Sequence, residues 1–343
     1  MATQMISCGK HGIVYRCDGS LSAPVVSVLN TASEELRDKL SHAEGPWCLK
    51  VLRTTERHAT YLRDALAHVD AAGAMPSVLG CWDVAGDGAR QALAIATEWV
   101  EGSSLLDLVA RPYGETGGLA FAALFGLAKA LAEIDGSPHR FAHGDVKPSN
   151  VIVPAVGKLA DVAPHDVAAA ARPVRLVDFD TVSLAATPRT FAMLGTRDFS
   201  APECKTCPPN AASDVYSLGA CINYVLSNAS GEHSVNSLAE PRPANSSAEL
   251  HPGTSPAPAY AETSQQAARP ISSPVKARSS ILLDADCAGN ASDLAARCMR
   301  PDPARRPSAA QAAEEMRQMG WANNEFTALP QEINPPLFIG NQE

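Results

Sequence analysis

The order of the secondary-structure signals predicts an α+β protein with two lobes, a small β-sheet lobe over residues 1–98 and a larger helical lobe over residues 103–320. Short runs rich in β-branched residues dominate the first lobe, whereas longer apolar runs at helical spacing dominate the second. Strands that precede helices in this way are typical of α+β folds. The chain of 343 residues is long enough to bury a sizeable core in such a fold.

In the first lobe, "MISCGKHGIVYRC" and "PWCLKVLR" predict strands. Between them lies an insertion over residues 18–45, in which "SEELRDKLSHAEG" combines a capping serine, helix formers and a final glycine. This pattern predicts a short helix. Residues 56–70 carry apolar side chains at helical spacing, and further strands are expected at residues 78–84 and 92–100.

In the second lobe, the apolar run from Leu119 to Ile134 predicts a buried helix, because Lys129 interrupts it and it falls short of the roughly 20 residues that cross a bilayer. "ASDLAARCMRPDPARRPSAAQAAEEMRQM" predicts two amphipathic helices around a proline-containing turn. Residues 228–280 consist mainly of Ser, Pro, Ala and Glu, and we expect a disordered insertion there, since little apolar surface offsets the ordering entropy. Residues 321–343 form a C-terminal tail without a clear pattern.

The composition argues against several classes of partner. With 28 Lys and Arg against 37 Asp and Glu, the chain has a net charge of −9 and its cations are scattered, so we expect no nucleic-acid partner. No basic-then-apolar leader begins the sequence and no run is long enough to span a membrane. We therefore expect no membrane association and a cytoplasmic location, or a nuclear one. The nine cysteines have neither disulfide-framework nor zinc-site spacing.

The segment "HGDVKPSN", residues 143–150, concentrates several functional groups between two hydrophobic stretches. Phosphoryl transfer needs an acid–base residue near the acceptor hydroxyl, cations on the phosphates and oxygen ligands for a metal ion. Asp145 stands where a base is needed, and Lys147 can neutralise charge on the moving phosphoryl group. Asn150 can hold a metal through its side-chain oxygen. The spacing therefore indicates a catalytic loop.

Other segments supply complementary chemistry. Asp178 follows the strand-like part of "VRLVDFD", a natural position for a magnesium ligand. Lys50 lies between apolar neighbours in "CLKVLR", and a lysine on the inner face of a strand requires an anion. Gly9 and Gly12 in "SCGKHGIV" let backbone N–H groups approach phosphates. Each signal alone is weak, since a glycine pair is often a plain hairpin turn, but their order along the chain makes the combination specific.

These segments resemble the motifs of the eukaryotic-type protein kinase family over nearly the whole chain. "HGDVKPSN" is similar to the family's H-R-D-x-K-x-x-N loop, "VDFD" to its D-F-G, "CLKVL" to its V-A-I-K and "APE" to its A-P-E. "TEWVEGSSLLDL" resembles the hinge between the lobes. "SDVYSLG" resembles the start of a buried helix whose Asp214 braces the catalytic loop, and "RPDPARRPSA" resembles the turn in which Arg306 pairs with Glu203.

The resemblance implies a role for each motif residue. Asp145 would be the catalytic base, Lys50 would contact the α- and β-phosphates of ATP, and Mg2+ would be the metal cofactor. Protein substrates are implied, and Lys147 and Thr196 are similar to the pair found in kinases that act on Ser and Thr hydroxyls. The resemblance further implies that Asn150 and Asp178 bind magnesium and that Gly9, Gly12 and Val14 contact the nucleotide. It also implies that Thr97 is the gatekeeper residue and that Glu98 and Val100 contact the adenine.

Several positions depart from the family pattern. Ser7 replaces the first glycine of the phosphate loop, a mild change because the other two glycines remain. For the helix acid that pairs with the strand lysine we expect Asp64, since Glu56 lies too early in the sequence. Asp180 replaces the glycine of D-F-G, and because Asp tolerates positive φ, we expect altered switching with metal binding retained.

Gly144 replaces the arginine of H-R-D. In members that carry this arginine, a buried cation lies beside the catalytic base and is commonly balanced by a phosphate on the activation loop. Without the arginine that requirement disappears. We therefore predict that activity does not depend on phosphorylation of Thr187 or Thr190, with Thr196 set apart as a structural residue.

Two alternatives to an active protein kinase stay open. The H-G-D sequence also resembles aminoglycoside and choline phosphotransferases, which share the two-lobed fold, although Lys147, "GTRDFSAPE", "DVYSLG" and "RPDPARRP" favour a protein kinase. The changes at Ser7, Asp64 and Asp180 admit a pseudokinase, a kinase-shaped binding or scaffold module without activity. For the insertion 228–280, a loop that binds a partner or regulator and a tolerated surface insertion are both open interpretations.

Overall fold

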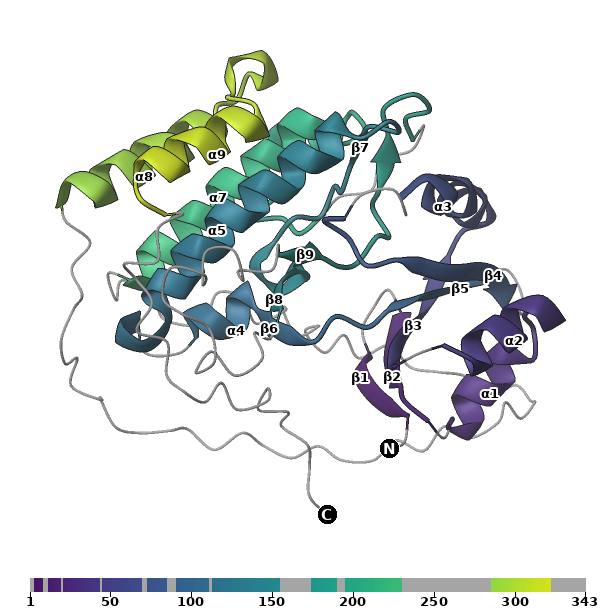
Figure 1. Cartoon of the computed structure of the whole chain (residues 1–343). Helices are drawn as coiled ribbons and strands as arrows, with labels where there is room; N and C mark the ends of the chain where they lie inside the picture. Colours follow the sequence, from purple (N-terminus) through teal and green to yellow (C-terminus); the bar gives the residue numbers. More distant parts are fainter. Residues whose placement is uncertain are drawn as a thin grey trace, which may run out of the picture.

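The computed structural model describes residues 3–8, 12–19, 21–43, 45–69, 73–84, 91–110, 113–154, 174–189, 195–229 and 285–321. It contains a lobe built on a β-sheet and a lobe built mainly of helices, which follow one another along the chain (Figure 1). The predicted α+β fold with a small N-terminal sheet region and a helical C-terminal region is therefore confirmed.

The first lobe is built on a five-stranded antiparallel sheet in the order β1-β2-β3-β5-β4. Its strands are β1 (Gln4–Cys8), β2 (Gly12–Cys17), β3 (Trp47–Thr54), β4 (Val78–Val84) and β5 (Gln91–Glu98). Because side chains alternate across a strand, Lys50 of β3 shares one face with Leu52, while Trp47 and Leu49 share the other. The expected strands of this lobe are confirmed.

Two short helices from the insertion cover the outer face of this sheet at the right of Figure 1, namely α1 (Ala23–Leu29) and α2 (Glu34–Ser41). The helix α2 was expected from its capping serine, and the Ser33 side chain indeed accepts a hydrogen bond from the Leu36 N–H. The helix α1 was not expected. The indole N–H of Trp82 donates to the Val28 carbonyl at 3.3 Å and the Lys39 ammonium donates to the Leu79 carbonyl at 2.9 Å. The insertion is therefore a packed cover for the sheet.

The predicted helix after β3 is α3 (Glu56–Val69). It contacts β4 and β5, and its buried residues are His58, Ala59, Leu62, Ala65, Leu66 and Val69. These positions recur every three or four residues and therefore form one face of the helix. The buried face joins the large core cluster that continues into the second lobe.

The second lobe combines short strands with long helices. The strands β6 (Gly102–Ser104), β8 (Val151–Pro154) and β9 (Arg175–Leu176) form one small sheet, and β7 (Phe141–Ala142) pairs with β10 (Ser183–Leu184). The α-helices that the described residues of this lobe form are α4 (Leu105–Val109), α5 (Tyr113–Gly136), α7 (Ala211–Ala229), α8 (Ala285–Cys298) and α9 (Ala309–Gln318). Single 3-10 turns are η1 (Pro148–Asn150), η3 (Pro202–Lys205) and η5 (Pro303–Arg305).

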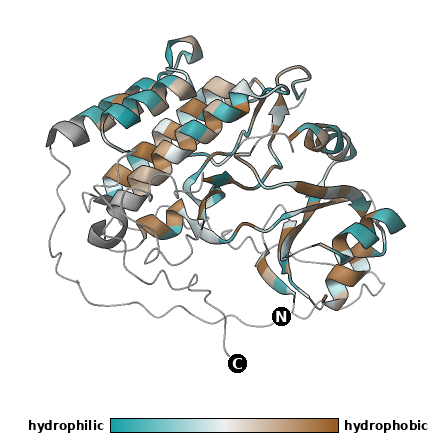
Figure 2. Cartoon of the chain, viewed as in Figure 1, coloured by the Kyte–Doolittle hydropathy of each residue, from teal (hydrophilic) through white to brown (hydrophobic). Residues whose placement is uncertain are grey.

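The helices α5 and α7 pack against each other, while α8 packs on α7 and α9 on α5. Figure 2 shows apolar residues along α5 and α7, in agreement with the buried side chains Leu124, Leu127, Leu131, Leu218 and Ile222. The predicted buried helix and the two predicted terminal helices are thus confirmed. Trp321, the first residue of the expected tail, is buried edge-on against Phe121 with ring centroids 4.8 Å apart.

Two expected segments lie outside the described residues. These are the rest of the C-terminal tail, residues 322–343, and nearly all of the expected insertion, from residue 230 onward. Among the helices that the structure does describe, each is too short or too polar to cross a membrane.

A buried ion pair joins the turn η3 to the residue that follows η5, as the resemblance implied. Arg306 donates from two nitrogens to Glu203, at 2.5 and 2.8 Å, and its side chain has no solvent exposure. The same guanidinium donates to the carbonyls of Ala212 and Arg300 and lies over the Tyr216 ring at 5.1 Å. Five donors with fixed geometry explain why an arginine stands here.

Removing this cation should destabilise the helical lobe. In Arg306→Ala the carboxylate of Glu203 stays buried without its partner, and losing one half of a buried pair costs about 3–5 kcal/mol of unfolding free energy. Denaturant unfolding followed by circular dichroism measures this loss. Arg317→Ala, which removes one half of the exposed pair with Glu314, is the matched control and should change little. Equal losses of unfolding free energy in both variants would contradict the stabilising role of the buried pair.

Candidate active site

The loop of residues 143–150, which was expected to be catalytic, runs between β7 and β8 and is braced by the N-terminal turn of α7. The buried carboxylate of Asp214 accepts the His143 N–H at 2.7 Å and the Gly144 N–H at 2.9 Å. Gly144 has φ of +79°, and a Cβ there would lie 2.6 Å from the Thr181 carbonyl oxygen. A glycine is needed at 144 for both reasons. The bonds from His143 and Gly144 agree with the bracing role that was expected for Asp214.

Asp145 and Lys147 of this loop form one cluster with Thr196 of the later segment 195–200, hereafter the Asp145 cluster. The Asp145 Oδ1 atom accepts from the Thr196 N–H at 2.7 Å and from its hydroxyl at 2.9 Å. The Lys147 ammonium lies 2.9 Å from Asp145 Oδ2 and 2.9 Å from Thr196 Oγ1. The structure therefore brings together the expected base, the expected cation and the threonine that was set apart as structural.

Asn150 ends the loop with its side chain oriented by Asp145. Its Nδ2 donates to the Asp145 carbonyl at 3.0 Å, so the amide oxygen is the atom left to face other groups. The hydroxyl of Ser149 is 3.4 Å from that oxygen. Asn150 and Asp178 both line the same cavity. One neutral and one anionic oxygen ligand facing one space fit a hard divalent cation.

The cavity between the sheet and the helical lobe has a volume of about 390 Å3, within the range of small-molecule sites. The expected residues that line it are Val14, Lys50, Thr97, Glu98, Val100, Asn150 and Asp178, together with Ser7. Gly9 lies outside the described residues. Gly12 begins β2, where an added Cβ would fall 2.3 Å from the Val51 carbonyl oxygen, so close strand packing is sufficient to explain this glycine.

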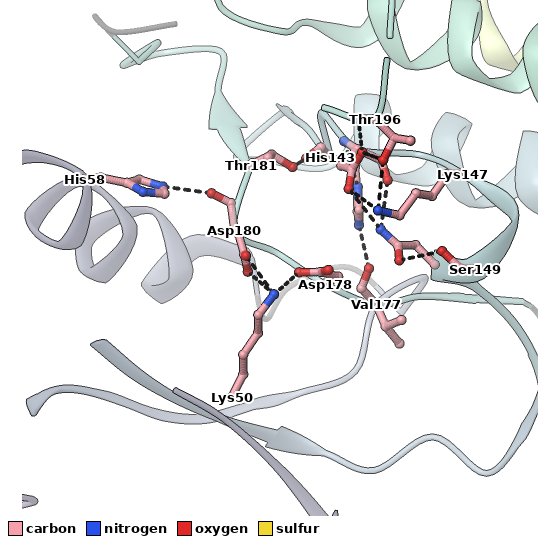
Figure 3. A network of polar contacts seen from close by, with 12 residues as sticks. Lys50, His58, His143, Lys147, Ser149, Val177, Asp178, Asp180, Thr181 and Thr196 are labelled. Carbon is pink, nitrogen blue, oxygen red and sulfur yellow. Dashed lines mark hydrogen bonds and ion pairs between the residues drawn. The ribbon is translucent and has the colours of Figure 1, made fainter. Parts of the chain in front are cut away.

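Lys50, Asp178 and Asp180 form a second cluster, hereafter the Lys50 cluster, shown at the centre of Figure 3. The ammonium lies 2.5 Å from Asp178 Oδ1 and 2.7 Å from each carboxylate oxygen of Asp180. Burial opposes the charge on Lys50, but Asp178 and Asp180 raise its pKa. Burial likewise opposes the charge on Asp178, yet Lys50 keeps its pKa below the usual range. The pKa of Asp180 is raised, first by burial and then by the neighbouring Asp178.

The expectation that Asp64 pairs with Lys50 is wrong. Asp64 is exposed on α3, two positions from the buried Leu62 and therefore on another side of the helix. The polar residue on the buried face is His58. Its Nε2 lies 2.8 Å from the Asp180 carbonyl oxygen and its Nδ1 lies 2.7 Å from the Thr54 hydroxyl. The role of His58 was not expected from the sequence, although the apolar spacing of α3 already placed residue 58 on the inner face. Asp180 was expected beside the magnesium ligand, but its contact with Lys50 was not expected.

Glu98, at the end of β5, also contacts the helical lobe. Thr97 is buried and stands opposite Cys48 of β3 in the strand register. The Glu98 carboxylate accepts from Arg175 of β9 at 3.0 Å, and the same guanidinium donates to the Met75 carbonyl at 2.8 Å. This ion pair links the two lobes beside the cavity and was not expected from the sequence.

A cavity between a sheet lobe and a helical lobe, with a lysine and carboxylates on its wall and a second carboxylate–lysine pair beside it, fits a phosphoryl-transfer protein. The comparisons define the family. The model of the protein kinase domain matches residues 39–318, and the chain belongs to the protein kinase family. A search of curated proteins gave no match.

The buried histidine should make the fold sensitive to acid. Burial lowers the pKa of His58 below 6.5, helped by the charge of Arg189 and opposed by the bond to Asp180. Below that pH the unfolded chain binds a proton that the folded chain does not, so the unfolding free energy falls as the pH falls, by at most about 1.4 kcal/mol per pH unit.

Urea unfolding at several pH values between about 5 and 8 measures this slope. In His58→Gln the part of the slope below pH 6.5 that comes from this side chain should disappear. His42→Gln, at an exposed position after α2, is the control and should keep the slope of the parent. A parent-like slope in His58→Gln would contradict the prediction.

Proposed function

We propose that this protein is an active kinase that transfers the γ-phosphate of ATP to Ser or Thr hydroxyls of protein substrates. The observation that carries the proposal is the Asp145 cluster. A carboxylate, an ammonium and a threonine hydroxyl lie within 2.9 Å of one another, and Asn150 of the same loop lines the cavity of about 390 Å3. Retention of Lys50, Asn150 and Asp178 on the cavity wall supports the same conclusion.

In the proposed reaction the oxygen of the acceptor hydroxyl bonds to the γ-phosphorus while the bond to the departing ADP oxygen breaks. Asp145 orients the hydroxyl and takes its proton. Lys147, held beside Asp145, offsets the negative charge that spreads over the transferred group. Lys50 would bind the α- and β-phosphates, and Val14, Thr97, Glu98 and Val100 would surround the adenosine part. Mg2+ bound by Asn150 and Asp178 would supply further charge neutralisation.

Specificity for Ser and Thr rests on the contact between Lys147 and Thr196. The Thr196 hydroxyl accepts from the Lys147 ammonium and donates to Asp145. This pair places an ammonium and a hydroxyl directly beside the proposed base. We further propose that residues 1–320 form the kinase domain and that residues 321–343 form a tail. We place the protein in the cytoplasm or nucleus. For the insertion 228–280 we propose a role in binding a partner or regulator.

Replacing the base tests the proposal most directly. Asp145→Asn keeps the shape of the side chain but removes the proton acceptor, so phosphate transfer should fall by about 10²- to 10⁴-fold. Transfer from labelled ATP to a generic basic protein, and to the chain itself, measures this. Binding of ATP, followed as a rise in melting temperature, should persist.

The control for this experiment is Asp64→Asn, which alters an exposed acid on α3 and should keep the activity of the parent. Equal transfer by the parent and Asp145→Asn would overturn the role of Asp145. A parent that shows a nucleotide-dependent rise in melting temperature without transfer would instead be a pseudokinase. Transfer to aminoglycoside or choline but not to protein would identify a small-molecule kinase.

Activity should also be independent of phosphorylation on the activation segment. The loop glycine removes the cation that such a phosphate would balance, and Thr187 is exposed with its carbonyl accepting from the Tyr61 hydroxyl. Thr187→Ala and Thr190→Ala should keep transfer within about twofold of the parent. Kinetics on phosphatase-treated protein measure this, and a large loss in either variant would contradict it.

A further inference from the structure

The Lys50 cluster has an unusual source for one of its carboxylates. Both carboxylate oxygens of Asp180 lie 2.7 Å from the Lys50 ammonium, so each accepts a hydrogen bond from it. The lysine side chain is 15% exposed and that of Asp180 is 11% exposed. Charge-assisted bonds in such a sheltered place are stronger than surface ion pairs. Asp180 is therefore a substantial constraint on where the ammonium lies.

The helix α3 supplies no carboxylate to this cluster. Its two acidic residues, Glu56 and Asp64, are both exposed. The buried face of the helix instead presents a neutral imidazole to the loop that carries Asp180. The partner of Lys50 that the family resemblance places on the helix thus comes, in this chain, from the turn after β9.

The two carboxylates of the cluster differ in their access to the cavity. Asp178 is 32% exposed, whereas Asp180 is 11% exposed. Asp178 contacts Lys50 through one oxygen only, while Asp180 uses both. The more open carboxylate is suited to a cation that enters from solvent, and the more enclosed one is suited to a permanent internal partner.

We propose that Asp180 is the positioning residue of Lys50 and takes the place of the missing helix acid, so that the ammonium is held where it can bind the phosphates of a nucleotide. This inference rests on the proposed function and deepens it. Lysine has a flexible stem with four rotatable bonds, and a fixed carboxylate reduces the entropy that is lost when the ammonium binds an anion.

The backbone of Asp180 is itself held by His58 of α3, which is bonded in turn to β3. The Asp180 carbonyl can only accept, so His58 donates from Nε2 at 2.8 Å and its Nδ1 accepts from the Thr54 hydroxyl at 2.7 Å. Figure 3 shows the His58 ring on the far side of Asp180 from Lys50. Because Thr54 and Lys50 both belong to β3, strand, helix and turn form one closed set of contacts around Asp180.

Nucleotide binding without metal isolates this effect from magnesium binding. The affinity for ADP, measured by calorimetry in the presence of a chelator, should fall by about 10- to 100-fold in Asp180→Asn. Asp180→Glu keeps a carboxylate and should recover most of the affinity. Asp64→Asn is the matched control and should bind ADP as the parent does. Melting temperatures without nucleotide show whether each variant is folded.

A double-variant cycle separates positioning from a merely structural role. If Asp180 acts through Lys50, then Asp180→Asn should have no further effect on ADP affinity in a Lys50→Met background. Additive losses would overturn the proposal. A loss that appears only when Mg2+ is present would also overturn it, and would make Asp180 a metal ligand instead.

These experiments distinguish a failure of the positioning role of Asp180 from a failure of the proposed kinase activity. Phosphate transfer by the parent, together with parent-like ADP affinity in Asp180→Asn, would overturn the positioning role and leave the kinase assignment intact. ADP binding that depends on Asp180, in a chain that transfers no phosphate, would support the positioning role and overturn the activity. A parent that binds no nucleotide would overturn both.

Discussion

The buried carboxylate of Asp214 is the constraint on which the rest of the site depends. Burial raises its pKa, and the N–H groups of His143 and Gly144 together with nearby positive charge oppose that shift. A buried carboxylate is tolerated only where such donors surround it. The two N–H groups therefore stabilise the carboxylate, and the carboxylate in turn holds the loop of residues 143–150, which fixes the position of Asp145 relative to the helix α7.

The same histidine connects the two charged clusters. The His143 ring lies 3.0 Å from the Val177 carbonyl through Nε2, and its own carbonyl accepts the Thr181 hydroxyl at 2.9 Å. Val177 and Thr181 flank the segment that carries both aspartates of the Lys50 cluster. Asp178 has φ of +75° there, a conformation that surrounding bonds must maintain in a non-glycine residue. The Asp145 cluster and the Lys50 cluster are thus parts of one hydrogen-bonded unit.

Much of the fold and the Asp145 cluster could be predicted, because their signals are local. Asp145, Lys147 and Asn150 lie within one short loop, and periodicity marked the longer helices. The helix α1 was missed because it has only seven residues and several valines, whose preference for strands was overridden by packing on the sheet. The bond from Lys50 to Asp180 spans 130 positions, and no pattern in the sequence specifies a contact of that range.

Two charges of this site differ in origin from the family pattern, because both come from the segment after β9. The carboxylate that grips Lys50 belongs to Asp180. The loop has glycine at 144, and a buried guanidinium, that of Arg189, acts electrostatically on Asp214 from the segment after β9. Buried charges are stable only while their counter-charges stay in place. A displacement of this segment would therefore remove the carboxylate beside Lys50 and the guanidinium near Asp214 at the same time. The position of the segment is thus the common determinant of both clusters.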